Sequence, residues 1–395
     1  DPLAVIPQLD TLGHGTAVAG VAAGNGRASR GMNEGVAPAA TLIVVRLGQR
    51  GRESFARTTE VMRAIKYCIE KATEMNLPLS INLSYGTNDG SHDGNSLFET
   101  YIDDMANRWK TVISVASGNE GFAGHHYRGV ATEGGTLTVQ FIIGGQINEL
   151  YLTLWKNYVD TFYFELISPA EQSSGRISPE DQVVSFTLDG ADITVFYGQP
   201  TEYNEAQEVF FQFRSGNGTV TQGLWMLNIY ASQVVDGVFD IWLPVTEQVS
   251  TETAFLRPDL NTTITLPATA NNVIAVGGYN SHINAITDFT GRGYTRSIVY
   301  VKPDLVAPAV AIITTRPGGG YDTFSGTSIA APFVTGSAAL LMEWGIVRGN
   351  DPFLYGQKVK AVLQKGARRS PGIRYPNREW GYGALCLAQT MTYLI

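Results

Sequence analysis

Three short stretches, far apart along the chain, each place a chemically useful side chain among small residues. They are GHGTAVAG around His14, ASGNEG around Asn119 and SGTSIAAP around Ser328. A serine hydroxyl becomes a nucleophile when a base takes its proton, and histidine is the side chain suited to that task near neutral pH. The carboxamide of Asn119 can donate a hydrogen bond to a developing negative oxygen. These residue types together predict acyl transfer by a serine nucleophile.

Each of these residues also has an ordinary structural explanation. Ser328 stands directly before a helix-like run and would serve as an N-cap, a lone histidine is more often structural, and asparagine beside glycine is common in turns. However, small residues let the backbone approach a ligand closely, and a helix N-terminus offers free N–H groups and a positive dipole end. Because the three stretches occur together, we favour the chemical interpretation.

The composition excludes several classes of function. The chain has 395 residues, 44% of them apolar, so it can bury a large core. Its net charge of -8 argues against nucleic acid or an anionic membrane surface as the main partner, since both reward clustered Lys and Arg. We see no uninterrupted apolar run that would span a bilayer. Cys68 and Cys386 are too few for a disulfide framework, and the initial Asp1 suggests a processed product or a fragment.

The histidines do not form a recognisable metal site. His125 and His126 are adjacent, so on an extended chain they point to opposite faces. No histidine is followed by glutamate in the zincin pattern, and no loop dense in carboxylates indicates calcium. We therefore predict neither a metal nor another cofactor.

Two patterns of elements must position the three side chains. The first third alternates apolar strand-like runs with helix-like runs, as an α/β fold with a parallel sheet does. The predicted strands are 41–47, 79–86 and 111–119, and the predicted helices are 58–75 and 96–109. The α/β pattern returns after residue 262 with the runs NNVIAVGGY and AIITT and with the helix that follows Ser328.

Between these parts lies a β-rich region. From about residue 125 to 261, short period-two runs rich in Thr, Val, Tyr and Phe predict eight or more strands in a sandwich or jelly roll. We therefore predict an α/β domain formed by residues 1–124 and 262–395 and interrupted by an all-β insertion at 125–261.

The stretches GHGTAVAG, LSYG, SGNEG and GTSIAAP, in this order, resemble the motifs of the subtilisin-like serine peptidases, or subtilases. The resemblance implies that His14 is the general base, Asn119 the oxyanion-hole side chain and Ser328 the nucleophile, with the backbone N–H of Ser328 as second oxyanion donor. It also implies an extended protein substrate that pairs with a strand and enters a specificity pocket. The implied substrate-binding residues, for which plain sheet strands are the alternative, are Leu83, Ser84, Tyr85, Gly86, Ala116, Ser117 and Gly118.

One part of the family pattern is missing. The family's catalytic Asp ends an earlier strand, and that strand is not found in this sequence. Asp10 lies only four residues before His14 and follows no strand-like run, so it is not given the role. Because the Asp orients the imidazole and stabilises its charged form, its absence matters. Three explanations are open: a cleaved segment that stays associated, residues outside this chain, or an enzyme that never had the Asp. We favour the first two.

The β-rich insertion narrows the resemblance. Together with the loop YGTNDGSHDGNSL, it is similar to the Csp group of clostridial subtilases, which carry a jelly-roll insert and act in spore germination. This resemblance implies a bacterial, spore-associated or secreted endopeptidase that removes its own prodomain and activates the zymogen of a cortex-lytic enzyme. Its partners would be a protein substrate and its own cleaved N-terminal segment.

Two other functions remain open at this stage. Some members of the Csp group are pseudoproteases, so the chain is alternatively a catalytically silent subtilase that binds a partner in germination. A weaker hypothesis makes the insertion a carbohydrate-binding module that uses Trp155, Trp225 and Trp242, although these aromatic residues are more often part of a core.

Overall fold

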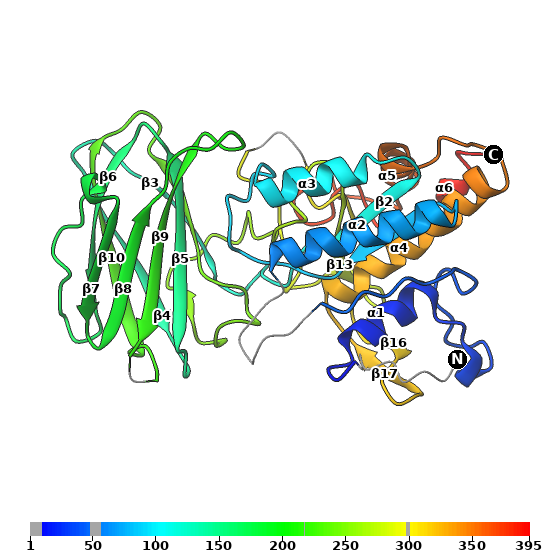
Figure 1. The fold of residues 1–395 in the computed structure, drawn as a ribbon, viewed down its shortest axis with the longest axis horizontal. Coiled ribbons are helices and arrows are strands. Elements are labelled where there is room, and N and C mark those ends of the chain that lie inside the picture. Colours follow the sequence, from blue (N-terminus) through cyan, green and yellow to red (C-terminus); the bar gives the residue numbers. More distant parts are fainter. Residues whose placement is uncertain (1–9, 48–56, 217, 298–300) are drawn as a thin grey trace.

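The computed structural model describes residues 10–47, 57–216, 218–297 and 301–395, which form an α/β part and a β part lying side by side (Figure 1). The α-helices are α1 (His14–Ala23), α2 (Thr58–Glu74), α3 (Leu97–Ala106), α4 (Thr327–Met342), α5 (Gly356–Lys365) and α6 (Leu387–Met391), with short helical turns at Arg27–Ser29, Pro179–Asp181 and Glu343–Val347. The strands of the α/β part are β1 (Leu79–Leu83), β2 (Thr111–Ala116), β13 (Ile274–Asn280), β14 (Ala285–Ile286), β15 (Leu305–Pro308), β16 (Ile312–Thr315) and β17 (Tyr321–Phe324).

The β part, called the insert below, consists of the strands between β2 and β13. They are β3 (His126–Val130), β4 (Thr136–Ile143), β5 (Glu149–Asn157), β6 (Thr161–Ile167), β7 (Val183–Leu188), β8 (Ala191–Tyr197), β9 (Ala206–Ser215), β10 (Gly223–Gln233), β11 (Val238–Trp242) and β12 (Ala254–Phe255). The prediction of many short strands between two stretches of α/β pattern is confirmed.

The central sheet has helices on both faces. Among the described residues its order is β1-β2-β13-β14, with β15 also paired to β13, and all pairs except β13 with β14 are parallel. Helices α2 and α3 pack on one face, and α4 and α5 pack on the other. Strand β2 is buried along its whole length, with Val112 facing α4 and Ile113 facing α3. Burial on both faces explains its continuous apolar sequence.

Helix α4 is apolar because it is the central helix of the core. The span Thr327–Val347 is long and apolar enough to cross a membrane, but 67% of its most apolar window is buried inside the protein. Its side chains pack against β2, β13, β15 and α5. On another side α4 contacts α1 through Ile329, which lies against Ala17 and Val21. This contact joins the helix that begins at His14 to the helix that carries Ser328 (Figure 1).

The predicted strand at 41–47 is wrong. Residues 41–47 belong to no strand, and Leu42, Val44 and Val45 are exposed to solvent. Within the described residues, β1 pairs with β2 on one side only and forms an edge of the sheet. An apolar run forms a strand only when a partner supplies the other half of its hydrogen bonds, and the described residues offer none to this segment.

The insert is made of two antiparallel sheets that share one core. The sheet orders are β12-β4-β10-β6 and β3-β11-β5-β9-β8-β7. Alternate residues of both sheets point inward, as a half-buried strand requires, and form a cluster rich in phenylalanine. Trp225 and Trp242 are fully buried, so two of the three tryptophans considered for carbohydrate binding are not available to a glycan.

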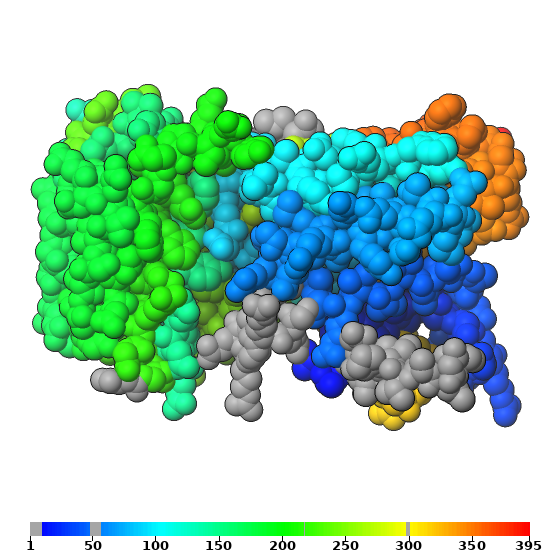
Figure 2. Space-filling view, in the orientation of Figure 1, coloured from blue at the N-terminus to red at the C-terminus, as the bar shows by residue number. Residues whose placement is uncertain are grey.

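Aromatic and imidazole rings join the insert to the α/β part. The indole of Trp242 lies between two rings, with centroids 4.1 Å from His92 and 4.7 Å from His126. The chain enters and leaves the insert at the same place, because Asp259 N–H donates to the carbonyl of His126 (2.9 Å). Figure 2 shows the green surface of the insert in contact with the cyan surface around α3.

Candidate active site

Ser328 is the second residue of α4, at a helix start that leaves it free of local bonds. Gly326 precedes the helix with a φ of 137°, a conformation that favours glycine, and Ser328 makes no capping bond to this helix end. The alternative explanation, in which Ser328 is an N-cap, therefore does not hold. Ser328 is half-buried, and neither its Oγ nor its N–H has a hydrogen-bond partner among the described residues. Both groups remain available to a ligand, at the positive end of the helix dipole.

Asn119 lies directly beside this helix start. Its Oδ1 accepts hydrogen bonds from the N–H and from the Oγ1 of Thr327, both at 3.0 Å. These bonds fix the carboxamide, so its Nδ2 is the end left to donate. Nδ2 lies 3.5 Å from Oε1 of Glu247, which is a long contact and leaves donor capacity for another acceptor. The structure thus brings Asn119 and Ser328 together from positions more than 200 residues apart in the sequence.

His14 is the first residue of α1, and a carboxylate anchors this helix start. Asp10 accepts hydrogen bonds from the N–H groups of Leu12, Gly13 and Thr16 and from Thr16 Oγ1, at 2.7–3.1 Å. Burial alone would raise the pKa of Asp10, but these bonds stabilise the carboxylate and lower the pKa to about 2. Asp10 therefore caps α1, and it makes no hydrogen bond to His14.

The imidazole of His14 is exposed, yet the groups around it shift its protonation. Partial removal from water lowers the pKa of His14, while the negative charges of Asp10 and Glu247 act to raise it. The packing of Ala17 and Val21 on Ile329 brings α1 to the start of α4. Thr315 Oγ1 also donates to the carbonyl of Thr16 (2.8 Å) and ties α1 to the β16–β17 hairpin. No hydrogen bond joins His14 to Ser328.

The first set of predicted substrate residues follows β1. Leu83 is the last residue of that strand, and Ser84 Oγ donates to the carbonyl of Ser328 (2.7 Å). Tyr85 packs edge-on against Phe98, and burial followed by the charge of Asp89 raises the pKa of Tyr85 to about 12. Together with Gly86, these residues form a segment that runs from the sheet past the start of α4.

The second set of predicted substrate residues follows β2. The side chain of Thr265 separates it from the first set. Ala116 ends β2, and the carbonyl of Ser117 accepts from the N–H of Thr265 (3.1 Å). A Cβ at Gly86 would lie 2.3 Å from Thr265 Oγ1, and one at Gly118 would lie 2.6 Å from the same atom. Thr265 therefore separates the two predicted substrate segments, and glycine is required on either side of it. Its Oγ1 is buried and has no hydrogen-bond partner in the part of the chain that the structure describes.

Two residues that border the site were not predicted from the sequence. Thr265 stands in the run TTITLPAT, where nothing marks it for a role. Glu247 belongs to the insert, whose position over the site follows from tertiary packing. Its contact with Asn119 brings the insert into the candidate site.

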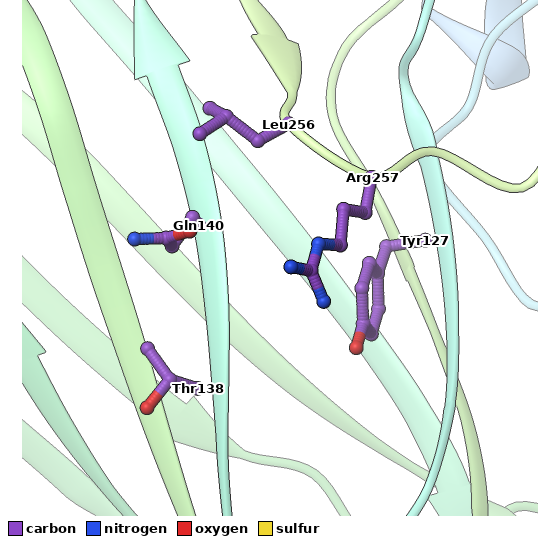
Figure 3. A pocket seen from close by; sticks show the side chains of 5 residues that line it. All are labelled: Tyr127, Thr138, Gln140, Leu256 and Arg257. Carbon is purple, nitrogen blue, oxygen red and sulfur yellow. The ribbon is translucent and has the colours of Figure 1, made fainter.

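A hollow of about 220 Å³ lies elsewhere, on the insert. It is lined by Tyr127, Thr138, Gln140, Leu256 and Arg257 (Figure 3). It contains none of the predicted site residues and no nucleophile with a base beside it. The described residues also contain no group of three or more His, Cys, Asp or Glu side chains able to hold a metal ion. The predicted nucleophile and oxyanion donor thus lie at the start of α4 and not at this hollow.

Comparison with known proteins agrees with this fold. A model of the family described as "Subtilase family" matches residues 6–219 and 204–383. The chain therefore belongs to the subtilase family, a family of serine peptidases.

Among solved structures, the chain is similar to the Clostridium perfringens CspB protease. The TM-score is 0.92 and the identity 38%, with coverage of 100% of this chain and 83% of that one. It also resembles an intracellular serine protease of Paenibacillus polymyxa (36% identity over 25% of this chain and 29% of that protein) and subtilisin E of Bacillus subtilis (40% over 20% and 19%). The matches thus span less than a third of these two relatives.

Proposed function

We propose that this protein is a serine endopeptidase. Ser328 attacks the peptide carbonyl, His14 takes the proton of Ser328 and later gives it to the leaving amine, and water then hydrolyses the acyl-enzyme. The oxyanion is held by Asn119 Nδ2 and by the backbone N–H of Ser328. No metal or other cofactor enters these steps.

One observation carries this proposal: the carboxamide of Asn119 is fixed by Thr327, the residue next to Ser328. The two bonds to Oδ1 direct Nδ2 away from Thr327, while the N–H of Ser328 has no partner among the described residues. A tetrahedral oxyanion requires two oriented donors beside a serine whose hydroxyl is free to react. A structural N-cap would instead direct the serine oxygen to its own helix.

The catalytic aspartate, in this proposal, comes from a further strand outside these 395 residues. Two observations support such a strand: β1 is an edge of the sheet, and the extended apolar segment 41–47 is exposed and unpaired among the described residues. A strand that paired with either would satisfy backbone groups and cover Leu42, Val44 and Val45. We infer that this strand remains associated as a cleaved segment or is part of the natural chain.

The substrate of this reaction would be a protein in extended conformation. It would lie between residues 83–86 and 116–118, where backbone groups pair with it and Thr265 limits the depth of the pocket. Ser84 supports this role indirectly, because its bond to the carbonyl of Ser328 ties the substrate segment to the nucleophile.

The biological role that fits best is activation of a zymogen, such as the precursor of a spore cortex-lytic enzyme, after removal of the protein's own prodomain. The similarity to CspB over the full chain supports this part of the proposal. It also supports a bacterial, spore-associated or secreted location. We further propose that the two-sheet insert is a jelly roll formed by residues 125–261, with residues 1–124 and 262–395 forming the peptidase domain.

The alternative function is a silent subtilase that binds a partner in germination. It is favoured by one observation: no carboxylate among the described residues bonds to His14, and His14 is not bonded to Ser328. An imidazole without an orienting partner is a poor base.

Reaction with a serine-directed phosphonofluoridate distinguishes the two functions. Intact mass spectrometry of the natural full-length protein should show one adduct, and peptide mapping should place it on Ser328. Ser328→Ala and denatured protein serve as controls and should not react. If the folded parent protein also fails to react, the endopeptidase proposal is wrong and the silent subtilase takes its place.

A further inference from the structure

A turn of the insert is clamped beside the candidate active site. The turn runs from Val245 to Gln248, closed by a bond from Gln248 N–H to the Val245 carbonyl (2.8 Å). The N–H and the Oγ1 of Thr246 both donate to Glu120 Oε1 at 3.0 Å. Glu120 is buried and follows Asn119 directly, so the turn is attached to the chain next to the oxyanion donor.

Further bonds make this attachment rigid. The other oxygen of Glu120 contacts His125 Nδ1 (2.5 Å), and His125 Nε2 contacts the carbonyl of Thr253 (2.9 Å). Glu120 and His125 are both nearly inaccessible to solvent. Buried and charge-assisted hydrogen bonds are stronger and less mobile than exposed ones, so the turn has a fixed position.

The residue at the tip of this turn is Glu247. Its Oε1 lies 3.5 Å from Asn119 Nδ2, and its charge acts to raise the pKa of His14 against the larger effect of burial. Glu247 is exposed, and no Lys or Arg pairs with it among the described residues. The carboxylate of Glu247, which has no basic partner among the described residues, is thus held near the proposed oxyanion donor Asn119 and the proposed base His14.

Two further charged residues, Asp89 and Arg292, lie near the substrate segments. Asp89 contributes to the raised pKa of Tyr85 on the substrate segment, after burial. Arg292 follows Gly291, whose N–H donates to the Gly118 carbonyl (3.0 Å), but its guanidinium already pairs with Glu379 (3.3 Å). A substrate cation would therefore meet the Glu247 carboxylate without competition from Arg292.

We propose that Glu247 is a specificity-determining residue of the peptidase, through which the insert selects substrates with Lys or Arg next to the scissile bond. This inference rests on the proposed function. A carboxylate about 4 Å from an ammonium group at a partly exposed site favours it over a neutral side chain by roughly five- to tenfold, and it disfavours Asp or Glu by a similar factor. Backbone pairing along residues 83–86 would hold the peptide in place.

The test uses quenched fluorescent peptides in matched trios that differ only by Lys, Gln or Glu at one position on either side of the cut. The parent should cleave a Lys peptide with a kcat/KM roughly tenfold or more above that of its Glu partner at one of these positions. Glu247→Gln should abolish this ratio, and Glu247→Lys should reverse it. Glu252 is an exposed carboxylate that, like Glu247, lies between β11 and β12. Its replacement, Glu252→Gln, is the matched control and should retain the parent ratio.

Two outcomes would overturn the inference. If the ratio of kcat/KM between the Lys and Glu peptides is the same in Glu247→Gln as in the parent, Glu247 does not take part in substrate recognition. Alternatively, Glu247→Gln can raise kcat/KM equally for all three peptides, which would make Glu247 a blocking group on Asn119. Unchanged thermal unfolding of each variant shows that the fold is intact.

A binding measurement separates this inference from the proposed function. Fluorescence anisotropy with the Ser328→Ala protein compares the Kd of the Lys and Glu peptides without any cleavage. If the parent neither cleaves nor reacts with the phosphonofluoridate, but binding in the Ser328→Ala background prefers Lys and depends on Glu247, only the endopeptidase proposal fails. If binding shows no charge preference, the inference about Glu247 is wrong.

Discussion

The core of the insert and the contact between helices α1 and α4 differ in the size of their side chains. The core of the insert is filled by large aromatic residues, among them Phe141, Phe164, Phe211, Phe213 and Trp225. Helices α1 and α4 meet through Ala17, Val21 and Ile329, and each helix has a glycine where a neighbouring group comes very close. A Cβ at Gly336 would lie 2.6 Å from Val36 Cβ, and one at Gly20 would lie 2.1 Å from Thr315 Oγ1.

This difference in side-chain size indicates different roles for the two parts. Large aromatic residues bury much apolar area and so stabilise a sandwich, whatever their exact partners. Small residues bury little area, but they let α1, which begins at His14, pack closely against α4, which carries Ser328. We therefore expect insert substitutions to lower stability and site substitutions to lower catalysis.

The largest effect expected from this contrast is on the stability of the insert. Phe211→Ala removes a fully buried ring that packs edge-on against Phe164 (5.3 Å between centroids), and it should destabilise the insert by about 3–5 kcal/mol. Phe210→Ala, on the opposite and half-buried face of β9, is the matched control and should cost clearly less. Denaturant unfolding measures both, and equal losses would contradict the described packing.

The next effect is on catalysis. Asn119→Ala removes one oxyanion donor, and such a loss lowers kcat by on the order of 10²- to 10³-fold in subtilisin-type enzymes. KM should change little, because the donor acts on the transition state. Steady-state kinetics on one peptide, with thermal unfolding as a check of the fold, give the answer. A rise in KM without a fall in kcat would assign Asn119 to substrate binding instead.

The stability of the α/β part should depend on pH because this part contains the buried carboxyl group of Glu99, whereas the core of the insert is apolar. Glu99 is fully buried at the start of α3, where burial raises its pKa to about 7 although Ser96 and Thr269 donate to it. The folded state therefore holds this proton more tightly than the unfolded state, with its ordinary pKa of 4.5. The group's contribution to stability is present below pH 4.5 and is lost as the pH rises to about 7.

Replacing the carboxyl group removes this dependence. Between pH 5 and 8 the parent should lose about 2–3 kcal/mol that Glu99→Gln does not lose, and the two should differ most in slope near pH 6. Urea unfolding of both proteins at several pH values measures the difference. Parallel pH profiles would show that Glu99 does not titrate in this range.

The smallest effect concerns the clamp between the two parts. Thr246→Val removes the hydroxyl bond to Glu120 while the backbone bond stays, so it should lower stability by about 1 kcal/mol. Thr251→Val, an exposed threonine of the same connecting segment, should have no measurable effect. Melting temperatures compare the two. A loss in Thr251→Val as large as in Thr246→Val would mean that the clamp is not what holds this segment.

The fold was predictable where a segment's own pattern decides its structure. Period-three and four spacing predicted α2 and α3, and short period-two runs predicted the insert, because each pattern reflects which face is buried. The segment 41–47 shows the limit. Its apolar residues are typical of a buried strand, but a strand also needs a paired neighbour, and that condition lies outside its own sequence.

The site was predictable only in part, for a similar reason. His14, Asn119 and Ser328 could be proposed because each stands among small residues and because the three stretches occur together in a pattern that resembles the family motifs. Glu247 and Thr265 could not, because their positions depend on how the insert docks and how three distant segments pack. Local patterns reveal groups that the backbone positions nearby, whereas groups that arrive through tertiary packing leave no local pattern.

The bond between Asp259 and His126, where the chain enters and leaves the insert, has a consequence for the order of folding. Between β2 and β13 the unfolded chain would be a loop of roughly 150 residues, whose closure costs conformational entropy that grows with the logarithm of its length. An insert that has already folded holds its two ends together and reduces this loop to roughly 25 residues, which lowers the entropy cost by about 1.5–2 kcal/mol. A folded insert therefore makes it easier for β2 and β13 to pair.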